Sequence, residues 1–263
     1  NVPLVLDIES GFKWDVVYKR KYLLHHFNIK AEIASPWESF LTRGGRIRRC
    51  LLRKINKIIP FKNRFYITED FKNFDPRILQ VKVRRRVYLE GYWQSEKYFK
   101  DIEDVIRKDF QIVTDFDHIT LSEAEMILKK NSVCVGIRRF QEGLNPDNRP
   151  LSIEYYLKAI DMMAQKIPDA HFFVVTEDPE WVNKNLKIPY PFTLISHKEG
   201  NHRAYENLWL MSLCKHFVIS QSTYHWWGAW LSSNPDKIVI ASEPDMVRTG
   251  KDFVPDNWIK IKP

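Results

Sequence analysis

Two neighbouring arginines, Arg138 and Arg139, directly follow an apolar run from 132 to 137 that reads as a buried strand. A guanidinium group makes bidentate, charge-assisted hydrogen bonds to phosphate oxygens, so an arginine pair at the end of a strand suits a diphosphate. The same two residues could instead form a structural salt bridge or a solvated pair. The pattern therefore supplies a candidate phosphate site without deciding between these interpretations.

Two carboxylates, Glu177 and Asp178, follow the next apolar strand, predicted over 171–175. Such groups could accept hydrogen bonds from the N–H donors of a guanine base or from ribose hydroxyls. Pro179 suits the first turn of a helix, so Thr176 or Asp178 could simply cap that helix. Without further information, the cap is the favoured interpretation.

A third candidate, Ser222, Thr223 and Tyr224, lies between an apolar strand and a tryptophan-rich helix. Hydroxyl groups and unpaired N–H groups at the start of a helix can donate to a phosphate. The tryptophans are interpreted as core residues. His225, which follows, could act as a base or pack in the core, and packing is the favoured interpretation.

Asp115 and Asp117 form an Asp-x-Asp pattern that could hold a divalent metal in a metal-dependent sugar transferase. So short a pattern arises easily by chance, and no clean apolar strand precedes it. We therefore expect both carboxylates to be exposed to solvent, with no metal site.

Short apolar strands alternate with helices in the second half of the chain. Strands are predicted over 132–137, 171–175, 192–195, 217–219 and 237–241, and helices over 152–167, 179–186, 204–214 and 226–231. This alternation predicts an α/β fold with a doubly wound parallel sheet, whose ligands bind at the carboxyl ends of the strands. Residues 1 to about 125 are less regular, and the segment 120–130 is the expected boundary between the predicted domains 1–125 and 126–263.

The 263 residues, 44% of them hydrophobic, suffice for two medium-sized globular domains. Three scattered cysteines (Cys50, Cys134 and Cys214) favour buried thiols in a reducing compartment. No apolar stretch approaches the ~18 residues of a membrane span, and no signal peptide opens the chain. These features predict a soluble, cytoplasmic protein.

The basic charge is concentrated in residues 43–64, which contain nine basic residues and no acidic one. The remaining 32 basic residues nearly balance 33 acidic ones. Ile47, Leu51, Ile55 and Ile58 recur among these cations at helical spacing, which predicts a basic amphipathic helix. The helix could bind an anionic membrane surface from the inner face, or pack its apolar residues on its own domain. Nucleic acid is not expected as a partner, because no motif of a nucleic-acid-binding fold accompanies the segment.

Several longer segments resemble glycosyltransferase family 11, the α-1,2-fucosyltransferases. Residues 87–99 resemble its "YLEGYWQS–KYF" signature, 176–181 its "SDDPEW", 204–216 its "DL-LMSLCKH" helix and 222–231 its "NSTFSWWGAWL", and 234–239 and 255–258 continue the match. The similarity runs in family order over nearly the whole chain and is densest after Val87.

This resemblance implies a GT-B fold, in which two Rossmann-like domains face a cleft. It places GDP against the second domain and the acceptor against the first. It also implies an inverting displacement at C1 of GDP-fucose by the 2-hydroxyl of a galactoside, without a metal cofactor. The expected setting is the synthesis of a bacterial surface glycan such as O-antigen, on an oligosaccharide or lipid-linked acceptor.

The resemblance also assigns roles to the candidate residues. Arg139, with Arg138 beside it, is expected to hold the diphosphate. Ser222 and Thr223, helped by the following backbone at Tyr224, are expected to donate to the β-phosphate. Glu177 and Asp178 are expected to recognise the guanine or its ribose. In a site without metal, Arg139 and helix-end donors would stabilise the charge that develops on the leaving group.

The sequence departs from the family pattern in two places. The usual His-x-Arg-Arg-x-Asp has Gly136 in place of the histidine and Gln141 in place of the acid. Glu142 is the nearest carboxylate and is predicted to be the general base, with Asp147 a comparable candidate. The family's opening glycine-rich segment, close to "GGLGNQ", would precede Asn1, so we expect a truncated chain.

Three alternatives remain open at this stage. The first is a metal-dependent transferase built on Asp115 and Asp117. The second is a transferase that uses another nucleotide sugar. The third is a non-catalytic nucleotide-sugar or glycan-binding protein, in which the changes at Gly136 and Gln141 mark lost chemistry.

Overall fold

The chain folds into two compact units, residues 1–113 and 114–263. The structure, a computed structural model, describes residues 2–13, 15, 20–39, 43–69, 73–83, 86–139, 150–195, 201–244 and 249–263. Helices alternate with strands in both units, and all paired strands of the named sheets run parallel. The predicted α/β class is therefore confirmed, and each unit is described by itself below.

The division between the units lies earlier than the boundary predicted at 125/126. That boundary falls inside helix α3 (His118–Leu128), which packs against helix α6 (Ala204–Leu213) and strand β5 (Asn131–Ile137). The Thr120 hydroxyl donates to Glu206 Oε2 at 2.8 Å and fixes α3 on α6. These contacts are tertiary, so the local sequence pattern could not reveal them and indicated a boundary within α3. The helix belongs to the second unit.

The second unit is built on a six-stranded parallel sheet with the order β10-β9-β8-β5-β6-β7. Its other strands are β6 (Ala170–Thr176), β7 (Phe192–Ile195), β8 (His216–Ile219), β9 (Val239–Ser242) and β10 (Ile259–Ile261). This is the strand order of a dinucleotide-binding Rossmann sheet. The chain reverses its direction of travel across the sheet between β5 and β8, and such a switch point is where ligands of these folds bind.

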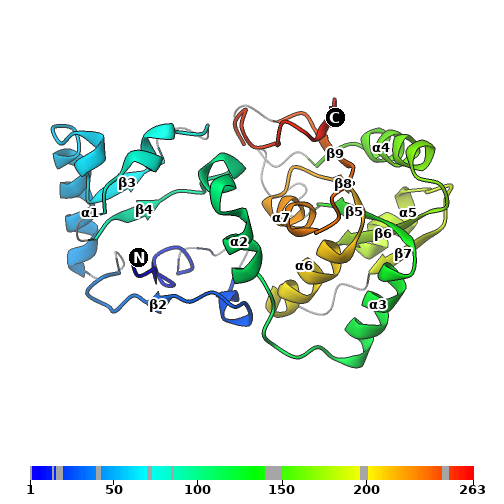
Figure 1. Ribbon diagram of the computed structural model, residues 1–263, viewed down its shortest axis with the longest axis horizontal. Coiled ribbons are helices and arrows are strands. Elements are labelled where there is room, and N and C mark those ends of the chain that lie inside the picture. Colours follow the sequence, from blue (N-terminus) through cyan, green and yellow to red (C-terminus); the bar gives the residue numbers. More distant parts are fainter. Residues whose placement is uncertain are drawn as a thin grey trace. The chain divides into compact units, whose positions relative to one another are not determined.

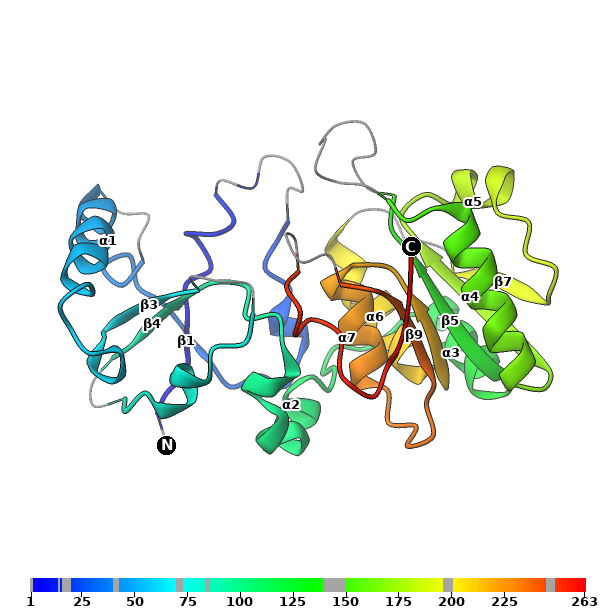
Figure 2. The ribbon, with the colours of Figure 1, turned by 90° about the horizontal axis from the view of Figure 1, so that it is seen from above.

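Helices cover both faces of this sheet. Helices α4 (Ile153–Lys166) and α5 (Pro179–Asn185) lie on one face, and α6 and α7 (Thr223–Leu231) lie on the other (Figure 1, Figure 2). Tyr156, Ile160 and Met163 of α4 are fully buried against the apolar side chains of the central strands. This core keeps the sheet rigid, so the loops at its carboxyl edge have fixed starting points.

The predicted elements of the second unit largely correspond to the observed ones. Ser152 caps α4 by accepting a hydrogen bond from Tyr155 N at 3.1 Å, as the predicted start at 152 requires. Helix α7 begins three residues before the predicted 226, and β10 was missed. The strand β10 is only three residues long and is defined by its pairing with β9. No local sequence pattern reveals this pairing.

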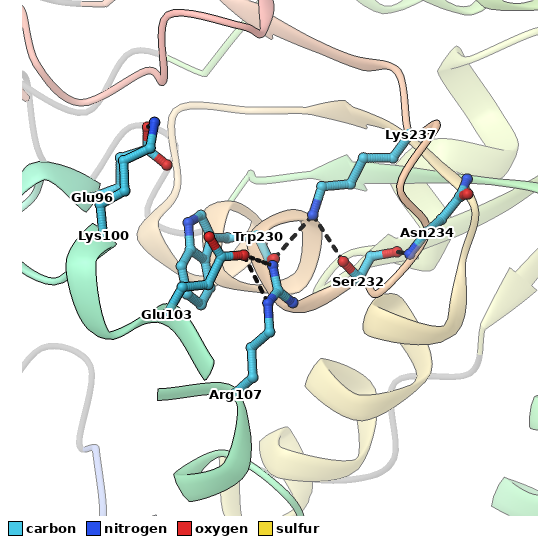
Figure 3. Close-up of polar contacts among 8 residues, drawn as sticks. All are labelled: Glu96, Lys100, Glu103, Arg107, Trp230, Ser232, Asn234 and Lys237. Atoms are coloured by element: carbon cyan, nitrogen blue, oxygen red, sulfur yellow. Dashed lines mark hydrogen bonds and ion pairs between the residues drawn. The ribbon is translucent and has the colours of Figure 1, made fainter. Parts of the chain in front are cut away.

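The segment after α7 stabilises the carboxyl ends of two helices. Lys237 Nζ donates to Trp230 O at 3.0 Å and to Ser232 O at 2.8 Å, where α7 ends (Figure 3). Asn234 Nδ2 donates to Lys215 O at 2.9 Å, just beyond α6. A cation at the carboxyl end of a helix satisfies carbonyls that have no partner within the helix. This part of the family-like sequence therefore has a structural role.

The first unit contains two separate pairs of parallel strands in its described residues. Strand β1 (Val5–Leu6) pairs with β2 (Glu32–Ile33), and β3 (Tyr66–Thr68) pairs with β4 (Tyr88–Glu90). The unit also contains helices α1 (Arg43–Ile55) and α2 (Glu103–Asp109) and short 3-10 turns at 24–26, 61–63, 76–80, 96–98 and 100–102. The paired strands are parallel, as expected, but they do not join into one sheet within the part described.

Polar contacts connect the strand pairs of the first unit. The Tyr88 hydroxyl donates to Asp7 Oδ2 at 2.9 Å, and burial together with this contact raises the pKa of Tyr88 to about 12.

On α2, Arg107 pairs with Glu103 one turn earlier (Figure 3). No helix within the described residues is long and apolar enough to cross a membrane.

The cysteines only partly follow the expectation of buried thiols. Cys134 and Cys214 are buried and free, and burial is the main reason why the pKa of Cys214 is raised. Cys50 is also free but exposed on α1, so the expectation was wrong for this residue. Helix α1 turns Cys50 away from the interior of the first unit.

Close packing of α7 on α6 depends on Gly228. A Cβ at this position would lie 2.8 Å from Met211 Cβ, next to the helix backbone, where neither atom can easily move away. We expect Gly228→Ala to lower the free energy of unfolding by about 1–3 kcal/mol, measured by thermal unfolding. Gly11→Ala is the matched control, because a Cβ on Gly11 meets nothing within 4 Å. An equal, small effect of both variants would contradict the role of Gly228.

Candidate functional site

The sheet brings the polar residues of three loops to one edge. Arg138 and Arg139 follow β5, and Ser220 to Thr223 follow β8, its neighbour across the switch point. Ser220 N donates to Gly136 O at 3.1 Å, which joins the two strand ends. Glu177 follows β6, the other neighbour of β5, at the same edge of the sheet. The residues predicted to form a site therefore start from adjacent strand ends.

Arg139 is oriented by residues of the β6–α5 segment. Its main-chain N–H donates to Glu177 Oε1, and its guanidinium lies over the ring of Trp181, 3.9 Å from the centroid. A guanidinium on an indole face is attracted by the negative face of the ring. In the sequence Trp181 belongs to a family-like motif, but no local pattern reveals that its ring lies under the Arg139 guanidinium.

Glu177 and Asp178 have structural partners in the structure. Asp178 Oδ1 accepts a hydrogen bond from Trp181 N at 2.9 Å and caps α5, as favoured from the local pattern. Glu177 receives the main-chain N–H of Arg139. Together these contacts fix the chain that carries Trp181 next to the chain that carries Arg139. Recognition of a guanine or ribose by either carboxylate stays a prediction.

Ser222, Thr223 and Tyr224 lie at the start of α7, as predicted. Ser222 is the N-cap residue, but its side chain makes no capping hydrogen bond, and Thr223 is exposed. The Tyr224 hydroxyl donates to Ala204 O at 2.6 Å, and burial raises its pKa. The hydroxyl proton of Tyr224 is therefore already used, and a contact of its backbone with a ligand at this helix start stays a prediction.

Two tyrosines of α4 support the switch point from the opposite face of the sheet. The Tyr155 hydroxyl donates to Ile219 O at 2.8 Å, at the last residue of β8. Tyr156 is fully buried, and burial raises its pKa, with Glu177 acting in the same direction and Arg139 in the opposite one. Burial keeps both phenols protonated, so they act as fixed dipoles under the two loops.

Three residues weighed in the sequence analysis lie outside the described residues. These are Glu142, predicted as the general base, its alternative Asp147, and Gln141. The other predicted site residues, from Arg138 to Tyr224, are all described.

The Asp-x-Asp pattern forms a structural cluster in the second unit. Asp117 caps α3 by accepting from Thr120 N at 2.8 Å, and its other oxygen pairs with Arg203 at 2.6 Å. Glu206 and Asp117 both raise the pKa of Arg203, Glu206 more strongly. Asp115 is exposed, as expected, whereas Asp117 is only partly so. Within the described ranges, no three His, Cys, Asp or Glu residues are grouped so that they could hold a metal.

A hollow of about 180 Å³ lies in the first unit, at the carboxyl end of β3. Aromatic and polar side chains line it together, among them Trp93, Tyr98, Glu69 and Asp75. Glu69 accepts hydrogen bonds from the main-chain N–H groups of Tyr92 and Trp93, at 2.7 and 3.1 Å. Aromatic faces with a few placed polar groups are typical of small-ligand sites.

The second unit is thus a Rossmann-type unit with cationic and hydroxyl groups at its switch point. The sequence profile of glycosyl transferase family 11 matches residues 47–262. The chain therefore belongs to glycosyl transferase family 11. Two α/β units, one with a doubly wound parallel sheet, agree with the GT-B type implied by the resemblance.

Three characterised relatives are similar to this chain. An α-1,2-colitosyltransferase of Escherichia coli is 31% identical over 65% of this chain and 61% of its own length. The O-antigen biosynthesis glycosyltransferase WbnK of Escherichia coli is 25% identical over 92% and 85%. A galactoside 2-α-L-fucosyltransferase of Caenorhabditis elegans is 27% identical over 71% and 56%. The chain thus spans less than two thirds of two of these relatives.

Two solved structures are distantly similar. A mutant of Arabidopsis thaliana FUT1 in complex with GDP aligns with a TM-score of 0.39 and 10% identity, over 68% of this chain and 51% of that chain. A family 9 glycosyl transferase from Veillonella parvula aligns with a TM-score of 0.38 and 9% identity, over 92% and 74%.

Substitutions of the two aspartates distinguish a structural cluster from a metal site. We expect Asp117→Ala to lower the free energy of unfolding by about 1–2 kcal/mol, because the cap of α3 is lost. Asp115→Ala is the control, since Asp115 is exposed. Thermal unfolding of both variants with and without Mn²⁺ is the measurement. A stabilisation by Mn²⁺ that both substitutions abolish would establish a metal site instead.

Proposed function

We propose that this chain transfers fucose from GDP-fucose to the 2-hydroxyl of a galactoside, with inversion at C1 and without a metal. The observation that carries the proposal is that Arg139 follows β5 while Ser222 and Thr223 follow its neighbour β8, at the switch point of a Rossmann sheet in a chain of family 11. The names of the relatives support the α-1,2 linkage, and WbnK supports a role in O-antigen synthesis.

The chemistry of the leaving group explains why these residues suit the reaction. GDP gains negative charge on its β-phosphate as the bond to the sugar breaks. The Arg139 guanidinium, held over Trp181, and the N-terminal N–H groups of α7 can stabilise that charge without moving. We assign Glu142 to the general base and the guanine or ribose contact to Glu177 and Asp178. We propose that the galactoside acceptor binds in the hollow beside Trp93 in the first unit.

Transfer assays with defined donors test this function. The chain is incubated with a β-galactoside and GDP-fucose, GDP-colitose or a UDP-sugar in the presence of a chelator, and the product linkage is determined by NMR. An α-1,2-fucosylated product supports the proposal, while a colitosylated product alone would move the chain to the other donor. GDP binding without turnover would favour the non-catalytic alternative.

Substitution of Trp93 tests the proposed acceptor site. Trp93→Ala should raise the KM for the acceptor but not the KM for the donor. A higher KM for the donor alone would refute the acceptor site.

Removal of the Arg139 guanidinium should affect the transition state most. We expect Arg139→Ala to lower kcat roughly 100-fold or more, as loss of a charge-stabilising donor does. Arg107→Ala serves as the control, because Arg107 forms a surface pair with Glu103 in the other unit. Steady-state kinetics with GDP-fucose is the measurement. Near-normal turnover of Arg139→Ala would remove this residue from the site.

We also propose that α1 binds an anionic lipid surface. Ile47, Leu51 and Ile58 are 65%, 52% and 84% exposed, so the apolar side of this segment is not packed on its own unit. Lys54 and Lys57 lie beside them, among the residues that line a broad basic groove. An exposed apolar stripe flanked by cations suits the interface of an anionic membrane. Two other cations have structural partners, since Arg48 donates to Trp37 O and Arg49 pairs with Glu90.

Vesicle binding tests this surface. We expect Lys54→Gln with Lys57→Gln to weaken binding to phosphatidylglycerol vesicles roughly tenfold or more, because each cation contributes about 1 kcal/mol near such a surface. Ile47→Ser with Ile58→Ser should also weaken it. Ile119→Ser is the control, since Ile119 is 50% exposed on α3. Transfer to a soluble acceptor should be unchanged, and equal binding by all variants or by neutral vesicles would refute the proposal.

A further inference from the structure

The imidazole ring of His225 occupies the space above Gly136. A Cβ built on Gly136 would lie 2.5 Å from His225 Cγ and 2.8 Å from both Cδ2 and Nδ1. Real atoms do not approach so closely, and the contact is with the inner part of the ring and not with a flexible end. Any side chain at 136 would therefore displace His225. Glycine is needed here because of this contact.

The same ring forms a hydrogen bond with the other strand of the switch point. His225 Nδ1 and Ser220 Oγ are 2.7 Å apart, and the two residues are only 4% and 3% exposed. Gly136 belongs to β5, Ser220 follows β8, and His225 lies in the first turn of α7. One buried imidazole thus contacts both strand ends and belongs to the helix whose start is the candidate phosphate site.

Both residues in contact also differ from the corresponding residues of the family motifs. The family motif has histidine where this chain has Gly136, and the "NSTFSWWGAWL" motif has serine where this chain has His225. The chain therefore has no imidazole at position 136 of β5 but has one on α7. This imidazole lies where a side chain at position 136 would be. A histidine at 136 and one at 225 would compete for the same space.

We infer that His225 is a positioning residue of the donor site, supplying from α7 the imidazole that the family motif supplies from β5. Through Ser220 it fixes the turn that leads to Ser222 and Thr223, and through Gly136 it fixes the strand that leads to Arg139. The two loops that would hold the diphosphate are thereby kept at a constant separation. This inference rests on the proposed function, because it assumes that these loops bind the donor.

Two conservative variants test the hydrogen bond. The amide of His225→Asn can take the place of Nδ1 and keep the contact with Ser220, whereas the amide of His225→Gln mimics Nε2 and loses it. We expect the Asn variant to keep the Kd for GDP within about threefold and the Gln variant to weaken it roughly tenfold, the equivalent of about 1.4 kcal/mol. Ser220→Ala should weaken binding to the same extent as the Gln variant. Equal Kd values for the Asn and Gln variants would overturn the inference.

Exchanging the residues at positions 136 and 225 tests whether the imidazole of His225 takes the place of the family's histidine. Gly136→His alone should clash with His225 and weaken GDP binding, and His225→Ser alone should remove the imidazole and weaken it at least tenfold. The double variant restores the family residues at both positions and should recover to within about threefold of the original chain. Residues in direct contact show such non-additivity, whereas independent sites do not. If the Kd for GDP of the double variant is raised by the product of the two single fold-changes, the inference is overturned.

The controls separate loss of folding and loss of function from loss of positioning. His216 lies at the other end of β8, and its Nδ1 accepts a hydrogen bond from Ile238 N at 3.1 Å. His216→Gln loses this contact and should therefore lower the melting temperature without changing the Kd for GDP. If the original chain does not bind GDP at all, the proposed function fails. If it binds GDP and His225→Gln binds equally well, only the inference fails.

Discussion

The parallel pairing of β5 with β8 determines which loops of this molecule can act together. Gly136 faces Ile219 in this pair, and Ser220 N continues it with a hydrogen bond to Gly136 O. Since β5 is followed by a loop on one side of the switch point and β8 by a loop on the other, the two loops diverge from adjacent starting points. An arginine and a helix N-terminus can then approach one ligand from two directions.

The other contacts of the site preserve this arrangement. Trp181 limits the orientations of the Arg139 guanidinium, and the Asp178 cap fixes the start of the helix that carries Trp181. Tyr155 holds the last carbonyl of β8 from the opposite face of the sheet. Hydrogen-bond donors that are already fixed before the ligand binds need no reorganisation during the reaction. The buried core of α4 and the central strands therefore contributes to function through rigidity.

Sequence patterns predicted the second unit well because its signals are local. Ser152 caps α4 within a few residues, and β5 is a continuous apolar run. Strand β10 and the placement of α3 depend on distant partners, so no local pattern could reveal them. The candidate site residues could be proposed because polar and charged residues directly follow the strands. The contact between Gly136 and His225 could not be seen, because residues almost ninety positions apart meet only in the folded sheet.

The first unit was predicted less completely for a related reason. Its strands are two or three residues long, so they carry little periodicity. The basic segment was correctly predicted to be helical as far as Ile55, but α1 ends there, before Ile58, and the different uses of its cations were not predicted. Arg49 and Arg53 share Glu90, a residue about forty positions away. Only the structure shows which cations serve the fold and which face solvent beside the apolar stripe.

Titration calorimetry with GDP and UDP, in the presence of a chelator, tests the central claim most directly. The claim is that the switch point of the second unit binds a guanosine diphosphate through Arg139 and the start of α7, with no metal. The account predicts that GDP binds under these conditions, that UDP binds much more weakly, and that Arg139→Ala weakens the binding of GDP. Preference for UDP, or binding only after Mn²⁺ or Mg²⁺ is added, would contradict it.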